Sequence, residues 1–324
     1  MKSVIRIIKT KEKSERLCEF IILIRILSFV QNIVLYKLDF TNYQINKSVI
    51  YIRFLLIIFI NTQSQPLTMK SLLIFIFCLM TISSFAQLQP IKSGVFKWDD
   101  HKVVQNGDRV GRPIFEGTSP HFDYLEIHAT TQAIGASAST AHANEDIEEL
   151  VIVKEGKMEV MLNGKGNILG PNGVLSLMPQ QMHSLKNVGD TPLTYYVIRF
   201  RSKKPMNLER GRASGSTLII NSDSTTYKPT SVGGVRSYFD RATTMCERLE
   251  MHVTTLDGKV ASHEPHSHVE SEIILMISGE TAQLIDGQEY TAKAGDFYFM
   301  ESQHIHGIRN ISDEPATYFA FKWK

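Results

Sequence analysis

The sequence predicts an all-β protein made of two tandem copies of one domain. The segment Leu125–Thr131 (LEIHATT) recurs as Leu249–Thr255 (LEMHVTT), an offset of 124 residues, and such self-similarity marks a duplicated unit. Within each copy, short apolar or alternating runs are separated by turn residues, and no stretch carries a sustained helical period. The dipeptides Asn163-Gly164 and Asp286-Gly287 are hairpin signals at matching places in the repeat. These patterns by themselves predict a sandwich or a barrel.

The first 86 residues differ in character from the rest of the chain. A basic start at Met69-Lys70, an apolar core over residues 72–80 and a small-x-Ala exit at Ala86 are the parts of a secretory signal peptide. We therefore predict that residues 69–86 are a signal peptide cleaved after Ala86, and that residues 1–68 are an upstream extension. The protein is then expected to be periplasmic or secreted.

A membrane anchor is the competing interpretation of the N-terminal region, because residues 20–36 and 49–60 are apolar. Arg25 and Arg53 interrupt these two segments, however, and no uninterrupted run approaches the ~20 residues that span a bilayer. We expect no stable membrane span after signal cleavage.

The remaining 238 residues are mildly acidic, with 24 Lys/Arg, 29 Asp/Glu and a net charge of −5. A protein of this charge has no electrostatic reason to bind nucleic acid. Cys246 is the only cysteine after residue 86, so no internal disulfide can form. Stability must therefore come from packed cores.

The repeat divides this part of the chain into four segments. Residues 87–111 form an N-terminal arm, 112–201 the first domain, 202–234 a linker rich in Ser, Thr, Lys, Arg and Gly, and 235–324 the second domain. Within the linker, Leu218–Ile220 could add an edge strand to a sheet.

Candidate metal ligands gather in the second domain. His266 and His268 share one face of an extended segment, because side chains alternate along a strand, and Glu272 four residues later can turn to the same point. His306, which lies far along the chain, is the candidate fourth ligand. Three neutral imidazoles and one carboxylate suit manganese, iron, zinc, nickel or cobalt, so we expect one divalent transition metal.

These residues resemble the two motifs of the cupin superfamily. The first motif is complete, with His266, His268, Glu272 and Gly279 at the family spacing; the second keeps Gly295, His306 and Asn310. Glu301 replaces the usual Pro and Gln303 the usual Gly, which affects a turn and leaves the ligand in place. The resemblance implies two tandem cupin jelly-roll barrels, with the metal site in the second.

The matching site in the first copy is eroded. His142, Glu149 and His183 survive, but Asn144 stands where the second histidine should be, so we expect at most a weak second metal site. Glu148 is an alternative to its neighbour Glu149. We choose Glu149 because its spacing to Gly156 equals that from Glu272 to Gly279. The other interpretation is a structural copy that supports the active domain.

The resemblance implies a range of activities, and a fold cannot name the reaction. We expect a metal-dependent enzyme that acts on a small oxygen-chelating substrate such as a sugar acid, a ureido acid or a similar carboxylate. A dioxygenase of the quercetinase type and a non-catalytic, exported carbohydrate- or metal-binding cupin are the alternatives. The family also implies a possible homodimer.

Two residues beside the ligands are candidates for moving a proton, namely His304 and Glu301. His263 is a further neighbour, and exposed loop-end histidines are an equally good interpretation of His263 and His304. Four side chains are candidates for lining the second barrel, although core packing explains them equally well: Met276, Gln283, Phe299 and Phe319.

Overall fold

The computed structural model describes residues 88–324, and this part of the chain is built mainly of strands, as the sequence predicts. The predicted signal peptide and upstream extension lie outside the described residues. Within residues 88–324, no helix is long and apolar enough to cross a bilayer.

The first barrel is made of ten strands. Its strands are β2 (Val104–Asn106), β3 (Arg109–Gly117), β4 (Phe122–Gln132), β5 (Glu148–Glu155), β6 (Met158–Leu162), β7 (Lys165–Leu169), β8 (Val174–Leu177), β9 (His183–Asn187), β10 (Leu193–Ser202) and β11 (Leu218–Ile220). They form a seven-stranded antiparallel sheet in the order β11-β8-β5-β10-β4-β3-β2 and a three-stranded sheet in the order β7-β6-β9.

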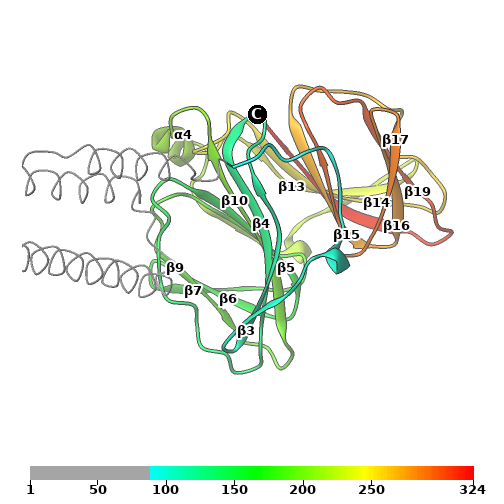
Figure 1. Ribbon diagram of the computed structural model, residues 1–324. Coiled ribbons are helices and arrows are strands. Elements are labelled where there is room, and N and C mark those ends of the chain that lie inside the picture. Colours follow the sequence, from blue (N-terminus) through cyan, green and yellow to red (C-terminus); the bar gives the residue numbers. More distant parts are fainter. Residues whose placement is uncertain (1–87) are drawn as a thin grey trace, which may run out of the picture. The chain divides into compact units, whose positions relative to one another are not determined.

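The second barrel repeats this arrangement. Its strands are β1 (Gly94–Phe96), β12 (Tyr227–Thr230), β13 (Gly233–Arg241), β14 (Leu249–Leu256), β15 (Ser271–Ser278), β16 (Glu280–Ile285), β17 (Gln288–Lys293), β18 (Phe297–Met300), β19 (His306–Asn310) and β20 (Ala316–Trp323). The sheets run β1-β18-β15-β20-β14-β13-β12 and β17-β16-β19. Figure 1 shows the first barrel, mainly in green, beside the second, in yellow to red.

Both predicted hairpin turns are confirmed. Asn163 and Gly164 have φ angles of 49° and 78° and join β6 to β7, while Asp286 and Gly287 have φ angles of 46° and 84° and join β16 to β17. Positive φ at both central residues is the type I′ geometry that matches the twist of antiparallel strands.

The two barrels exchange strands. The arm strand β1 precedes the first barrel but pairs with β18 of the second, and β11 precedes the second barrel but pairs with β8 of the first. The expectation that Leu218–Ile220 adds an edge strand is thus confirmed. Each large sheet is completed by the segment that leads into the other barrel.

The linker also contains a helix that the sequence did not predict, α4 (Leu208–Ala213). The Asn207 side chain accepts a hydrogen bond from the Arg210 amide at 2.8 Å and caps the helix. The Arg210 side chain donates to the carbonyl oxygens of Thr243 and Thr244. Six residues are too few to show a helical period, so no sequence signal was available.

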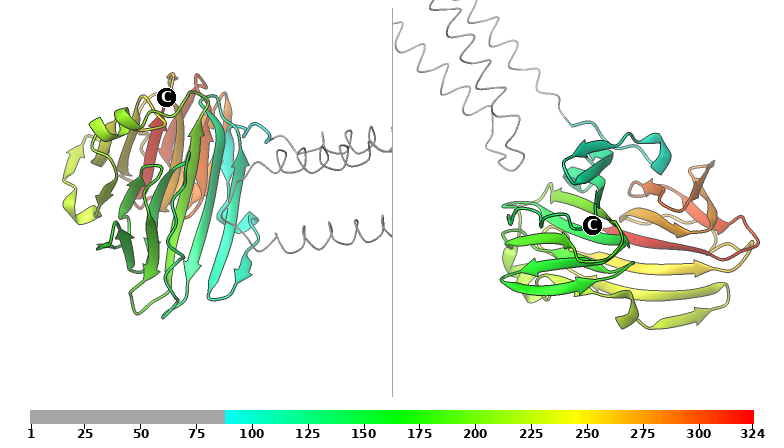
Figure 2. Two further views of the ribbon diagram at one scale, coloured as in Figure 1. Left: turned by 90° about the vertical axis from the view of Figure 1, so that its left-hand side faces the viewer. Right: turned by 90° about the horizontal axis from the view of Figure 1, so that it is seen from below.

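The two large sheets pack face to face and share one apolar core. Leu125 and Ile127 of β4 and Met251 of β14 lie in this core, and the stacked rings of Phe122 and Trp323 join the barrels with centroids 5.2 Å apart. In both views of Figure 2 the red strand β20 lies beside the green strands of the first barrel. The opposite face of each large sheet lines its own barrel, where separate cores form.

This layering decides which residues line the second barrel. Met276 belongs to the core inside that barrel, and Gln283 is fully buried. Phe299 and Phe319 instead pack into the core shared between the barrels, so for these two residues core packing is the interpretation that holds and barrel lining is not. Both faces of β18 and β20 are apolar, and residue type alone does not distinguish them.

A buried carboxyl lies at the junction of the two barrels. Glu148 is 1% exposed, and its Oε2 accepts hydrogen bonds from the Thr243 hydroxyl at 2.8 Å and the Met245 amide at 3.0 Å. Burial raises the pKa of Glu148 from 4.5 to about 7, while these two donors and the charges of Arg241 and Arg210 oppose the rise. The folded protein therefore favours the protonated form.

This raised pKa predicts a pH-dependent effect of Glu148→Gln. Because the folded-state pKa is the higher one, the favourable contribution of protonated Glu148 is complete below pH 4.5 and is lost as the pH rises through about 7. Glutamine keeps the neutral state, so the variant should exceed the wild type in stability by up to about 3 kcal/mol at pH 8 and should differ little at pH 5.

Urea unfolding at the two pH values measures this difference. Glu155→Gln is the matched control, because Glu155 lies on the same strand and is exposed. An equal stability difference between Glu148→Gln and the wild type at pH 5 and pH 8 would contradict the prediction.

Candidate metal centre

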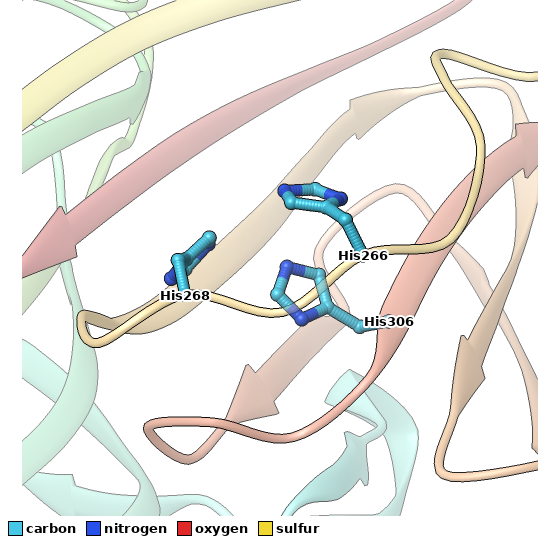
Figure 3. A group of neighbouring side chains, drawn as sticks. All are labelled: His266, His268 and His306. Atoms are coloured by element: carbon cyan, nitrogen blue, oxygen red, sulfur yellow. The ribbon is translucent and has the colours of Figure 1, made fainter.

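Three histidines converge in the second barrel. His266 and His268 lie in the segment before β15, and His306 begins β19. An isolated bridge joins the two segments: the His266 amide donates to the His306 carbonyl at 2.9 Å, and the His306 amide donates back at 2.8 Å. One nitrogen from each ring lies within 4.8 Å of one from each of the others, and Figure 3 shows the three rings gathered together.

Glu272, on β15, touches two of these rings. Its Oε2 lies 3.0 Å from Nε2 of His268 and 3.4 Å from Nε2 of His306. The Nδ1 atoms of the same two histidines face the backbone carbonyls of Glu270 and His304 at 3.0 and 2.9 Å. A carbonyl can only accept, so Nδ1 carries a proton and Nε2 is the ring nitrogen left to meet Glu272 or a metal ion.

The charge states at this site suit a metal ion. Although burial opposes ionisation, the imidazoles of His268 and His306 hold the pKa of Glu272 well below its usual range. Burial and the neighbouring imidazoles lower the pKa of His266, which favours the neutral ring. Metal ligands must be neutral imidazole and ionised carboxylate. Glu272 raises the pKa of His306 against the effect of burial, so metal binding has to displace a proton from that ring.

One ring nitrogen of His306 also indicates a metal site. His306 is 3% exposed, and its Nε2 forms no hydrogen bond within the described residues. A buried polar atom of this kind is costly unless something satisfies it. The side chains present fit a divalent transition metal held by three nitrogens and one oxygen.

The corresponding residues of the first barrel are arranged differently. His142 and His183 are joined by the same backbone bridge, with ring centroids 4.4 Å apart, and Glu149 Oε1 lies 3.6 Å from His183 Nε2. However, Glu149 Oε2 accepts hydrogen bonds from Nε of Arg199 at 2.8 Å and from Nδ2 of Asn144 at 3.3 Å. Glu149 does face the barrel and Glu148 the shared core.

Comparison with known families finds the same duplication of the domain. A family model described as cupin domain matches residues 130–199 and again residues 252–322. The chain contains two cupin domains. The two matched segments lie in the first and second barrels, which are therefore the first and second cupin domains.

Solved structures of similar fold include three that cover most of this cupin. A putative glyoxylate-induced protein from Pseudomonas aeruginosa is 12% identical with a TM-score of 0.59, covering 74% of this chain and 92% of its own. Protein Ylba from E. coli is 16% identical with a TM-score of 0.55, covering 76% and 96%. An oxalate decarboxylase from Lactobacillus farciminis is 12% identical with a TM-score of 0.55, covering 72% and 87%. At these identities the likeness shows the fold alone, and no curated protein sequence matches the chain.

The candidate proton carriers of this cupin lie close to each other. His304 Nδ1 is 2.6 Å from Asp286, and its Nε2 is 3.8 Å from Glu301. Ser93 of the N-terminal arm adds a contact, since its hydroxyl accepts a hydrogen bond from the Glu301 amide at 2.9 Å. Within residues 88–324 no hydrogen bond or ion pair joins the side chains of His304 and Glu301 to the side chains of the three clustered histidines, so their catalytic role stays a prediction. His263 packs edge-on against His266 with ring centroids 4.4 Å apart.

The sequence reasoning missed a row of charged residues beside the site. Lys322 on β20 lies between Glu250 and Glu272 in the strand register, and its Nζ is 3.5 Å from Glu250. Glu250 also meets Nδ1 of His252 at 3.3 Å and Nη2 of Arg248 at 2.6 Å. The repeated segment LEMHVTT contains Glu250 and His252, so the repeat was a sequence signal for these two residues.

Proposed function

We propose that the second cupin domain binds one divalent transition metal through His266, His268, Glu272 and His306, and that the protein acts there on a small oxygen-chelating substrate. The observation that carries this proposal is the gathering of three imidazoles, two of which meet the largely buried carboxylate of Glu272. A cluster of this kind, in which Nε2 of His306 forms no hydrogen bond within residues 88–324, is costly to maintain without a cation.

The bound metal would supply Lewis acidity, polarising a substrate carbonyl or carboxylate oxygen. The protein's own contribution is to hold the ligands in place. Backbone carbonyls orient the rings of His268 and His306 through Nδ1, which is the usual way in which a metal-binding histidine is fixed. His266 is the exposed member of the group, so the site is open to solvent on its side.

A carboxylate substrate, such as a sugar acid or a ureido acid, is supported by the charges around the site. The positive charge of the Lys322 ammonium opposes the rise in the pKa of His306. The Lys322 side chain is one-quarter exposed. An anion entering beside the metal would meet this cation. We assign proton movement to His304 or Glu301, both of which are partly exposed. The solved relatives include oxalate decarboxylases, which is consistent with chemistry on a small carboxylate.

We also propose that the protein is exported by cleavage after Ala86. Mass spectrometry of the protein recovered from the periplasm or medium should give a chain that starts at Gln87. A mature N-terminus near Met1 would contradict both the signal peptide and the upstream extension.

Metal analysis followed by ligand screening tests the proposed function. Purified protein should carry about one equivalent of a divalent transition metal, and small carboxylates should raise its melting temperature and undergo turnover. Stabilisation by such acids without turnover of any of them would favour the non-catalytic binder. A protein that contains and binds no transition metal would refute the proposal.

A further inference from the structure

The two cupin domains differ at one position on their last strands. Arg199 on β10 and Lys322 on β20 are equivalent in the repeat, and each lies between two glutamates in the strand register. The flanking pairs are Glu126 and Glu149 in the first domain and Glu250 and Glu272 in the second. Each barrel therefore contains a row of two glutamates with a basic residue between them, which is arginine in the first barrel and lysine in the second.

Arg199 bridges both of its neighbours. Its Nε donates to Glu149 at 2.8 Å, and its Nη1 lies 3.8 Å from Glu126. Glu149 is 3% exposed, so this ion pair is largely shielded from water. A planar guanidinium presents several donors at once, which allows one side chain to serve two carboxylates.

Lys322 contacts only the outer carboxylate of its pair. Its single ammonium lies 3.5 Å from Glu250, and Glu272 meets the imidazoles of His268 and His306 instead. Arg248 supports Glu250 as well, whereas the equivalent residue in the first domain is the uncharged Tyr124. The Glu272 carboxylate therefore faces the histidines and is not paired with Lys322.

We propose that this position decides which cupin domain can hold a metal: Arg199 takes the place of the metal as counter-ion of Glu149, and Lys322 leaves Glu272 free to bind one. Asn144 adds to the effect, since it both replaces a ligand and donates to the oxygen that Arg199 holds. The first site fails as a metal site because its carboxylate is already neutralised, in addition to lacking one imidazole.

The test exchanges the side chains of Lys322 and Arg199 in the full-length protein and measures Zn²⁺ binding by competition with a chromogenic chelator. This inference rests on the proposed metal site, so wild type is measured first and should bind about one equivalent. Lys322→Arg should weaken binding by about tenfold or more, as disturbing a residue next to a ligand does, because its guanidinium can reach Glu272. Lys322→Met removes the charge without adding a guanidinium group, and this variant should bind Zn²⁺ at least as tightly as wild type.

The reverse exchange should create a site. Arg199→Lys combined with Asn144→His should raise the Zn²⁺ content to about two equivalents, read by elemental analysis after dialysis. Circular dichroism and thermal melting establish that each variant is folded. If the double variant does not fold, the comparison of Lys322→Arg with Lys322→Met decides.

Three results would overturn the inference while leaving the proposed function intact. They are Lys322→Arg binding as tightly as wild type, Lys322→Met losing as much affinity as Lys322→Arg, and a folded double variant that still binds a single equivalent. A wild-type protein that binds no Zn²⁺, Mn²⁺ or Co²⁺ would instead refute the proposed function, and this inference with it.

Discussion

Replacing His266 and His306 together with alanine should reduce the metal bound by the purified protein from about one equivalent to none that elemental analysis detects. Two nitrogen ligands are lost, and Glu272 and His268 alone offer too few donors to compete with water for a transition metal. We expect the loss of any metal-dependent turnover to follow.

His263→Ala is the matched control for this double variant. Its ring packs against His266 but is not among the three clustered histidines, so metal content should be unchanged. Retention of a full equivalent of metal by the folded double variant would show that the ligands have been wrongly assigned.

Trp323→Ala should be the most destabilising of the single substitutions considered, with a loss of about 3–5 kcal/mol in the free energy of unfolding. Trp323 is 2% exposed and stacks on Phe122 of the first domain and on Phe299 of the second. Its removal leaves a cavity in the core that joins the two barrels. Urea unfolding at pH 7 measures the change.

Trp323→Phe separates lost packing from other causes. The indole Nε1 of Trp323 is buried and forms no hydrogen bond with any residue of the described range 88–324, so phenylalanine removes an unsatisfied donor and keeps an aromatic ring. This variant should lose clearly less stability than Trp323→Ala. Folded Trp323→Ala should still bind metal, because Trp323 faces the shared core and its neighbour Lys322 the barrel. A loss below about 1 kcal/mol for alanine would show that the core relaxes to fill the space.

Much of the fold was predictable because its signals are local. The two hairpin dipeptides and the spacing of His266, His268 and Glu272 each depend on residues a few positions apart, whose geometry follows from strand alternation and turn chemistry. The repeat is read by comparing two segments of the sequence and needs no knowledge of their contacts. The choice of Glu149 over Glu148 also followed from spacing alone, and the structure places Glu149 toward His183.

Other features depend on contacts between distant segments. The pairing of β1 with β18 brings the N-terminal arm onto the second barrel across more than 200 residues. The sequence of Gly94–Phe96 does not identify β18 as the pairing strand, since backbone hydrogen bonds carry no sequence information. The face of β18 that Phe299 occupies was likewise undetermined, because sheets packed on both sides are apolar on both.

The sequence by itself determined that the chain contains two cupin domains and that only the second keeps all three histidines and the glutamate, since these are matters of residue type and spacing. Only the tertiary structure decided which charges meet them. Arg199 lies 50 residues from Glu149 along the chain, yet the register of β5 and β10 places them side by side. Strand register is fixed by the packing of the whole barrel, and it is this that gives Glu149 a guanidinium as its partner and leaves Glu272 to the histidines.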